Sequence, residues 1–282
     1  MNRALPAVVL ALSCAGALAD ETLPLVRSFD HAGRERRALV HLPGGRAPTS
    51  PAPLVLALHG SGQTARSFSA KRGPLIRRAS EEGIVLVFPQ STELAGKTRW
   101  VRQEMEDAGD PIDDLGFLLR LIEVLEAEYA IDAKRVYATG FSSGALFCHE
   151  LGARATSTFA AIAPVAGSLP AGLPKPGGPI PILIVNGRRD PVRPYDGGPN
   201  EEGAPIASVA DTVHSWTTSN GCAERPEVEA GKGVRIERYS GDAEVVLVAL
   251  ARMDHQWPDA SEGFGWDANR EILEFFARHA RP

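Results

Sequence analysis

The stretch of sequence that decides the fold is RVYATGFSSGALF, residues 135–147. It opens as a short run of strand-forming residues, continues through Gly140-Phe141-Ser142-Ser143-Gly144 and closes on helix-forming residues. The two glycines let the chain turn sharply from a strand into a helix, and the turn lifts the side chain of Ser142 above the end of the strand. The stretch therefore predicts a strand, a tight turn and a helix, with a serine presented at the turn.

The rest of the chain alternates apolar runs with helical patterns on both sides of this turn. The expected strands are 36–42, 54–58, 84–88, 135–139, 159–165, 182–185 and 245–250. The expected helices are 67–82 (interrupted at Gly73-Pro74), 113–129, 143–154, 208–219 and 267–279. Continuous apolar strands separated by helices are typical of an α/β fold, a mostly parallel sheet with helices on both faces. We expect a single domain from residue 20 to residue 282.

Composition excludes several classes of protein. The 282 residues are 44% hydrophobic and 23% charged, an ordinary globular balance. The net charge of -5 gives no support to a nucleic-acid-binding surface. Three cysteines are too few for a disulfide scaffold or a Cys-rich zinc domain, and the glycine patterns of P-loop and dinucleotide sites are absent from the sequence. We therefore expect no metal, no cofactor and no nucleic-acid partner.

The first segment, residues 1–19, has the order of a signal peptide. A positive residue near the start is followed by an apolar run and by the small-x-small sequence Ala17-Leu18-Ala19. The run is too short for a comfortable membrane span, so we expect cleavage before Asp20, no stable membrane insertion and a secreted or periplasmic protein. Lipid attachment at Cys14 is the alternative, but residues 11–13 form a poor lipobox.

Two further loops supply the partners that a nucleophilic serine needs. Sites in such sheets form at the carboxyl ends of the strands. Asp190 follows the expected strand 182–185, and His255 follows the expected strand 245–250. His255 is the only histidine that both follows a strand and lies downstream of Asp190. This order predicts Ser142 as the nucleophile, His255 as its base and Asp190 as the orienting carboxylate; a turn aspartate before proline is the simpler alternative for Asp190 alone.

A glycine-rich loop, His59-Gly60-Ser61-Gly62-Gln63, follows the strand 54–58. Such a loop can point backbone N–H groups at a substrate oxygen. We expect the N–H groups of Ser61 and Ser143 to form the oxyanion hole, with Gly62 as the alternative to Ser61.

Three aromatic residues near the expected loops are candidates for substrate binding: Trp257, Tyr195 and Trp100. Packing within the protein is the alternative for each ring.

Together these motifs resemble secreted α/β-hydrolase esterases of the polyhydroxybutyrate-depolymerase and feruloyl/acetylxylan-esterase group. The resemblance covers most of residues 35–280. It rests on LVLALHGSGQ (54–63), IVLVFPQ (84–90), DDLGFLLRLI (113–122), RVYATGFSSGALF (135–147), FAAIAPVAGSLP (159–170), NGRRDPVRPYDGG (186–198), Trp216-x-x-x-Asn-Gly-Cys-Ala and His255-Gln256-Trp257-Pro258.

The resemblance implies an α/β-hydrolase fold and a triad of Ser142, Asp190 and His255. It also implies hydrolysis of carboxylic esters without a cofactor, the ester being a polyhydroxyalkanoate-type polyester or oligomer, or a feruloyl or acetyl ester of a polysaccharide. The chain departs from the usual pattern in two places that bear on the substrate. Ala251-Arg252-Met253-Asp254 replaces a glycine run before the histidine, and Arg188-Arg189 stands where smaller residues are usual.

Several alternatives stay open at the level of sequence. A serine peptidase, an acyltransferase or a binding protein without turnover could use the same fold, and the oligomeric state is not determined by these patterns. In an oxidising compartment Cys148 and Cys222 could pair; a buried free thiol at Cys148 is the other reading.

Overall fold

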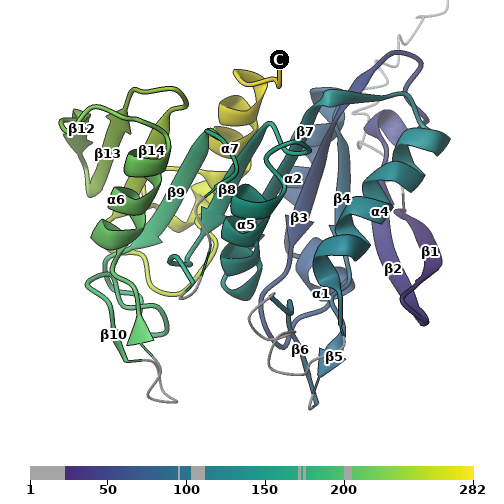
Figure 1. Cartoon of the computed structure of the whole chain (residues 1–282), viewed down its shortest axis with the longest axis horizontal. Coiled ribbons are helices and arrows are strands. Elements are labelled where there is room, and N and C mark those ends of the chain that lie inside the picture. Colours follow the sequence, from purple (N-terminus) through teal and green to yellow (C-terminus); the bar gives the residue numbers. More distant parts are fainter. Residues whose placement is uncertain (1–22, 95, 103–111, 171–172, 174–175, 200–204) are drawn as a thin grey trace, which may run out of the picture.

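The computed structural model describes residues 23–94, 96–102, 112–170, 173, 176–199 and 205–282. The predicted signal peptide, with Cys14, lies outside the described residues. Within these ranges a single large sheet of ten strands runs through the molecule, and helices cover both of its faces (Figure 1). The strand order is β1-β2-β4-β3-β7-β8-β9-β14-β13-β12.

The centre of the sheet is parallel. Its strands are, in spatial order, β4 (Val85–Pro89), β3 (Ala52–Leu58), β7 (Ile131–Phe141), β8 (Ala161–Val165), β9 (Ile182–Gly187) and β14 (Val245–Leu250). Helices cover these strands on both faces, which is why their sequences are continuous apolar runs. The carboxyl ends of β3, β7, β9 and β14 lie at one edge of the sheet, where the predicted loops meet.

Both ends of the sheet are antiparallel hairpins. They consist of β1 (Leu25–His31) with β2 (Arg34–His41), and β12 (Glu227–Gly231) with β13 (Val234–Tyr239). Each hairpin turns through two residues with positive φ, Ala32-Gly33 in one and Lys232-Gly233 in the other. Two short pairs, β5 (Glu93–Leu94) with β6 (Lys97–Thr98) and β10 (Gly198–Pro199) with β11 (Pro205–Ile206), lie outside the large sheet.

The helices form two layers. One face of the sheet carries α4 (Asp114–Glu128), α5 (Ser143–Arg154) and α6 (Val209–Ser219). The other carries α1 (Ala65–Ser69), α2 (Gly73–Glu81) and α7 (Ala268–Ala277). The described residues also contain two short 3-10 turns, η1 (Pro43–Gly45) and η2 (Ala260–Glu262). The predicted α/β fold is confirmed, but the expected helix 67–82 is two helices, because Pro74 starts a new helix at its second position.

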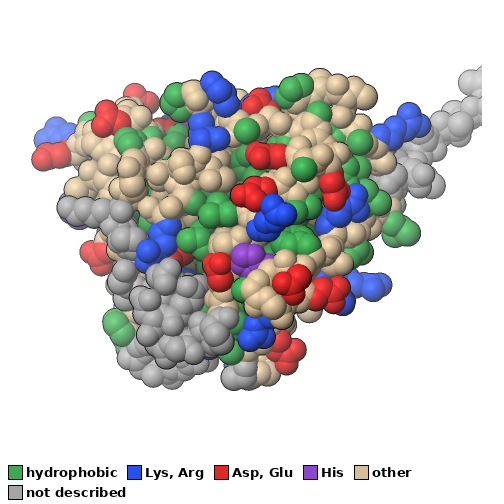
Figure 2. All heavy atoms as spheres, turned by 45° about the vertical axis from the view of Figure 1, so that its right-hand side comes forward, with side chains coloured by type: hydrophobic (Ala, Val, Ile, Leu, Met, Phe, Trp, Pro, Cys, Tyr) green, Lys and Arg blue, Asp and Glu red, His purple; other side chains and the backbone are tan. Residues whose placement is uncertain are grey.

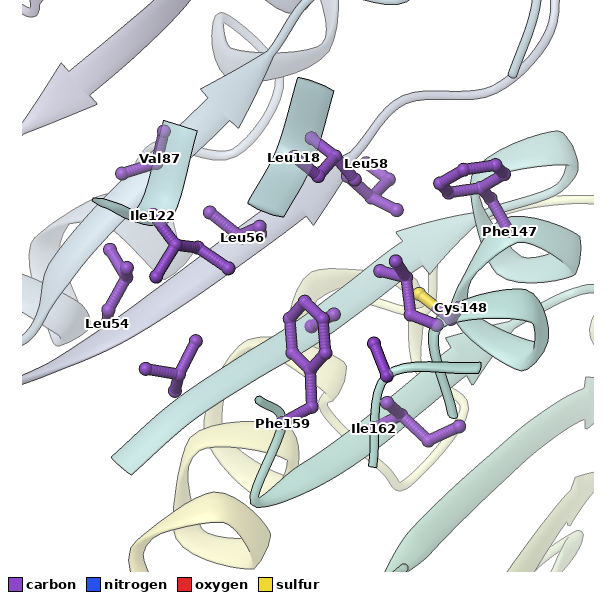
Figure 3. Close-up of a cluster of buried hydrophobic side chains, with 14 of the residues drawn as sticks. Leu54, Leu56, Leu58, Val87, Leu118, Ile122, Phe147, Cys148, Phe159 and Ile162 are labelled. Atoms are coloured by element: carbon purple, nitrogen blue, oxygen red, sulfur yellow. The ribbon is translucent and has the colours of Figure 1, made fainter. Parts of the chain in front are cut away.

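The core on the α4–α5 side joins the central strands to these helices (Figure 3). Leu54, Leu56 and Leu58 of β3 lie in the same buried cluster as Leu118 of α4 and Phe147 of α5. This packing fixes α5 on the sheet, and α5 begins directly after Ser142.

The surface carries charges of both signs. On the face seen in Figure 2, acidic and basic side chains are interspersed rather than gathered by sign. Among the described residues, no helix is long and apolar enough to cross a membrane.

Candidate active site

The turn between β7 and α5 has the predicted shape. Ser142 has φ 54° and ψ -115°, a left-handed conformation that a serine rarely adopts. A side chain at Gly140 would collide with the carbonyl of Gly144, and one at Gly144 with the carbonyl of Leu58. Only glycine fits at both positions, and the Ser142 N–H donates to the Val165 carbonyl at 3.0 Å. These contacts hold the strained turn in place.

Ser142, His255 and Asp190 form one hydrogen-bonded chain. His255 Nε2 lies 2.9 Å from Ser142 Oγ, and His255 Nδ1 lies 2.7 Å from Asp190 Oδ2. A carboxylate accepts hydrogen bonds, so Nδ1 carries the proton and Nε2 is left to accept one from the serine. The structure thus brings together the three residues expected from separate loops.

Asp190 is fixed by the main chain of its own loop. Its Oδ1 accepts the N–H groups of Val192 and Arg193 at 2.8 and 2.7 Å, which leaves Oδ2 to face the imidazole. The Asp190 side chain has no exposed surface. A buried carboxylate held by three hydrogen bonds can orient the ring without moving.

Main-chain contacts join the acid loop to the histidine loop. The Arg188 N–H donates to the Leu250 carbonyl at 2.9 Å, and the Arg189 N–H donates to the Met253 carbonyl at 3.1 Å. Gly187 lies so close to Met253 that a Cβ there would overlap the Met253 carbonyl. The separation of Asp190 and His255 is therefore set by backbone, which is stiffer than side-chain packing.

In the glycine-rich loop after β3, hydrogen bonding separates Ser61 from Gly62 as the candidate oxyanion-hole donor. The Gly62 N–H is already used, because it donates to the Thr98 carbonyl at 2.8 Å. Within the described part of the chain, the Ser61 N–H donates to no partner. The Gly60 N–H is held by the Gln63 side chain at 3.0 Å, which stiffens the loop. Of the two alternatives, the geometry favours the N–H of Ser61.

Ser143 is the first residue of α5. The first N–H groups of a helix have no acceptor within the helix, and they lie at the positive end of its dipole. The N–H groups of Ser143 and Ser61 are therefore the candidate donors to an anionic oxygen beside Ser142.

The first residue of the glycine-rich loop, His59, supports that loop with its side chain. His59 is buried; its Nε2 accepts the Ser91 N–H at 3.1 Å, and its Nδ1 donates to the Gly60 carbonyl at 2.9 Å. Burial lowers the pKa of His59 to about 4, so the ring is neutral at pH 7. A neutral ring is what this pair of hydrogen bonds requires.

Trp100 lies behind the same loop. Its indole N–H donates to the His59 carbonyl at 2.9 Å, and its ring lies between His59 and Phe147 at centroid distances of 5.3 and 5.4 Å. Only 2% of the residue is exposed. The structure therefore favours packing over substrate contact for Trp100.

A buried ion pair anchors the segment that carries Trp100. Asp114 pairs with Arg36, and its other oxygen accepts the Val101 N–H at 2.8 Å. Burial raises the pKa of Asp114, while Arg36 opposes that rise. The neighbouring residue Asp113 caps α4 by accepting the Gly116 N–H at 2.6 Å.

The other two candidate aromatics differ from one another. Trp257 is buried, and its indole N–H donates to Asn269 at 3.1 Å, which favours packing. The Arg72 guanidinium lies 4.7 Å from its ring centroid. Tyr195 is half-buried under the Arg188 guanidinium at 4.4 Å and lines an open cleft.

Cys148 and Cys222 are both free thiols, so the structure does not pair them. Burial raises the pKa of Cys148, which packs in the core.

Comparison with known proteins identifies the group. Residues 37–197 match the family described as esterase PHB depolymerase. Over 250 residues the chain is 32% identical to the candidate esterase NocK of Nocardia uniformis subsp. tsuyamanensis, covering 80% of this chain and 72% of NocK. It is 28% identical over 243 residues to feruloyl esterase B of Piromyces equi, covering 82% of this chain and 44% of that one.

The fold is also that of solved esterases. The acetyl xylan esterase from Aspergillus awamori superposes with a TM-score of 0.66 at 14% identity, covering 90% of this chain and 99% of that one. The family match spans more than half of the chain and includes the Ser142 turn, the glycine-rich loop and the acid loop. This chain therefore belongs to the esterase PHB depolymerase family of carboxylic ester hydrolases and has the α/β-hydrolase fold.

Proposed function

We propose that the chain is an exported serine esterase in which Ser142, His255 and Asp190 are the catalytic triad. The observation that carries the proposal is the hydrogen-bonded chain from Ser142 Oγ through both nitrogens of His255 to Asp190. A hydroxyl held 2.9 Å from an oriented imidazole nitrogen is an activated nucleophile.

The reaction follows from these atoms. His255 Nε2 takes the proton as Ser142 Oγ bonds to the ester carbonyl carbon, and Asp190 stabilises the imidazolium that forms. The N–H groups of Ser61 and Ser143 hold the carbonyl oxygen while it carries the negative charge. The C–O bond to the alcohol breaks, and the alcohol leaves with the proton from His255. Water, deprotonated by His255, then releases the acid and restores Ser142.

The substrates that this function would cover are feruloyl or acetyl esters of polysaccharides and hydroxyalkanoate polyesters or oligomers. Support comes from the family description and from relatives named as feruloyl esterase and acetylxylan esterase/xylanase. We further propose that residues 1–19 are removed on export and that residues 20–282 act as a single catalytic domain in the periplasm or outside the cell.

The test is hydrolysis of p-nitrophenyl acetate and butyrate by the chain from Asp20 onward, beside Ser142→Ala. We expect the variant to lose on the order of 10⁶ in kcat. Ser157→Ala is the matched control, because Ser157 is exposed and lies beyond the far end of α5. Equal rates for the wild type and Ser142→Ala would reject the nucleophile.

The same enzyme preparation separates hydrolysis from acyl transfer. With p-nitrophenyl acetate and an added sugar alcohol, a hydrolase releases mainly acetate, whereas an acyltransferase forms mainly the sugar-alcohol ester. A peptidase would instead cleave peptide p-nitroanilides faster than the esters.

A further inference from the structure

One concave surface of the molecule is lined by none of the three candidate triad residues. It is a cleft of about 750 Å³ between α6 and the β13–β14 side of the sheet, and we call it the α6–β13 cleft. The residues that matter for its chemistry are Arg188, Tyr195, Thr217, Glu224, Glu237 and Tyr239. Its volume is within the range of ligand sites, roughly 300–1,000 Å³.

The cleft shares a loop with the candidate active site. Arg188 and Tyr195 line it, and they flank Asp190 in the chain. Asp190 itself accepts two main-chain N–H groups from that loop, so the segment between the two lining residues is a fixed turn. A ligand in the cleft therefore contacts the loop that holds the acid.

The wall formed by β13 is polar and ordered. The Glu237 carboxylate accepts the Tyr239 hydroxyl at 2.8 Å and the Arg235 guanidinium at 2.6 Å. Arg188, which also lines the cleft, lies over the Tyr195 ring, 4.4 Å from its centroid. Tyr195, Glu237 and Tyr239 all line this cleft.

These groups select a ligand rich in hydroxyls. A carboxylate only accepts hydrogen bonds, so a ligand that covers Glu224 must bring a donor or leave the charge without its water. Glu237 already accepts from Tyr239 and Arg235, and its remaining lone pairs can accept from a ligand hydroxyl. A polyester chain offers carbonyl and ether oxygens and alkyl groups, and none of these donates. A sugar chain offers hydroxyl donors for the carboxylates, acceptors for Arg188 and Thr217, and C–H faces for the tyrosine rings.

We propose that the α6–β13 cleft binds a neutral oligosaccharide, the carbohydrate part of the ester substrate. The lining carries three carboxylates, Asp196, Glu224 and Glu237, and one guanidinium, Arg188, which disfavours an acidic ligand. The link to the substrate rests on the proposed function, but the binding itself does not, because it can be measured without turnover.

The test is calorimetric titration of full-chain Ser142→Ala with xylotetraose, cellotetraose and mannotetraose. We expect saturable binding of at least one of them. Adding Glu237→Gln or Tyr195→Ala should weaken that binding at least about fivefold, because each removes a group that contacts the sugar. Circular dichroism and Tm show whether each variant is folded.

The opposite edge of the sheet offers matched controls. Glu35 pairs with Arg37 on β2, and Tyr129 lies beneath Arg27 beside β1. Glu35→Gln and Tyr129→Ala repeat the two changes at equivalent pairs far from the cleft, and should leave the dissociation constant within about twofold.

Three outcomes would overturn the proposal. None of the sugars binds; a sugar binds with an affinity that the cleft variants do not change; or a 3-hydroxybutyrate trimer binds instead and is weakened by Glu237→Gln. Failure of the proposed function appears separately, as absence of p-nitrophenyl ester hydrolysis by the wild type.

Discussion

The indole N–H of Trp100 donates a 2.9 Å hydrogen bond to the main-chain carbonyl of His59. His59 in turn accepts the Ser91 N–H and donates to Gly60, one residue before Ser61. The buried Asp114–Arg36 pair holds Val101, next to Trp100. The loop that offers the Ser61 N–H is therefore positioned by side chains that are buried in the protein.

Trp100→Phe tests this support. The change keeps an aromatic ring but leaves the buried His59 carbonyl without its donor, which costs about 1–3 kcal/mol in the free energy of unfolding. We expect kcat for p-nitrophenyl butyrate to fall by about tenfold, less than the 10²–10³ for loss of an oxyanion donor. Trp266→Phe, buried on the other face of the sheet, is the control. Unchanged kcat in Trp100→Phe would show that the loop does not need this bond.

Asp190→Asn tests the acid. Asparagine keeps an oxygen for the N–H groups of Val192 and Arg193, so the fold and Tm should be little changed. The amide cannot fix the Nδ1–H tautomer in the same way, and we expect kcat to fall by about 10⁴. Asp254→Asn, an exposed neighbour of His255, should keep nearly the full rate. A larger loss in Asp254→Asn than in Asp190→Asn would assign the acid to Asp254.

Gly187→Ala tests the main-chain contact between the acid and histidine loops. The new Cβ overlaps the Met253 carbonyl, so backbone must move on the loop that leads to His255. Misplacement by about 1 Å can cost 10²-fold in rate, and we expect a kcat loss of at least this order. Gly231→Ala, where a Cβ meets no atom within 4 Å, should have wild-type kinetics. A Gly187→Ala enzyme with full activity would contradict backbone control of the triad spacing.

His59 should make stability sensitive to acid. Its pKa is about 4 in the folded chain and about 6.5 when unfolded, so below pH 6.5 the unfolded state takes up the proton first. The free energy of unfolding therefore decreases as the pH is lowered from about 6.5 to about 4. Between pH 7 and pH 4.5 this single residue accounts for about 2–3 kcal/mol, at 1.36 kcal/mol per pH unit.

Urea unfolding at the two pH values measures this contribution. His59→Gln should lose about 2–3 kcal/mol less than the wild type on acidification, since its side chain does not titrate. His214→Gln, exposed on α6, should lose as much as the wild type. Identical acid losses in His59→Gln and the wild type would mean that His59 does not carry the effect.

The parallel centre of the fold was predictable because its strands are buried on both sides. Continuous apolar runs such as residues 54–58 and 182–185 leave little choice of structure. The edge hairpins were largely missed because their strands face water; every residue of β12 is exposed. The local signals were the two-residue turns Ala32-Gly33 and Lys232-Gly233, which fit hairpin geometry.

The three residues of the candidate triad were predictable for a related reason, since each follows an apolar strand. The buried contacts that hold the surrounding loops in place were not predictable. Asp114 meets Arg36 across 78 positions of sequence, and Trp100 meets the His59 carbonyl across 41. Such pairs depend on how distant elements pack, and neither partner carries a local pattern. Trp100 became a candidate substrate contact because it lies in an expected loop, and nothing in the sequence indicated its bond to the distant His59 carbonyl.

The left-handed backbone of Ser142 lowers the stability of the fold at the same position whose hydroxyl is proposed to carry the activity. Holding a non-glycine residue in that region costs on the order of 1–3 kcal/mol. A library selected only for heat resistance would therefore reward Ser142→Gly, a change that relaxes the turn and deletes the hydroxyl. Engineering this enzyme for harsher conditions needs a screen for turnover at every round, with the stabilising changes drawn from the exposed edge hairpins rather than from the turn.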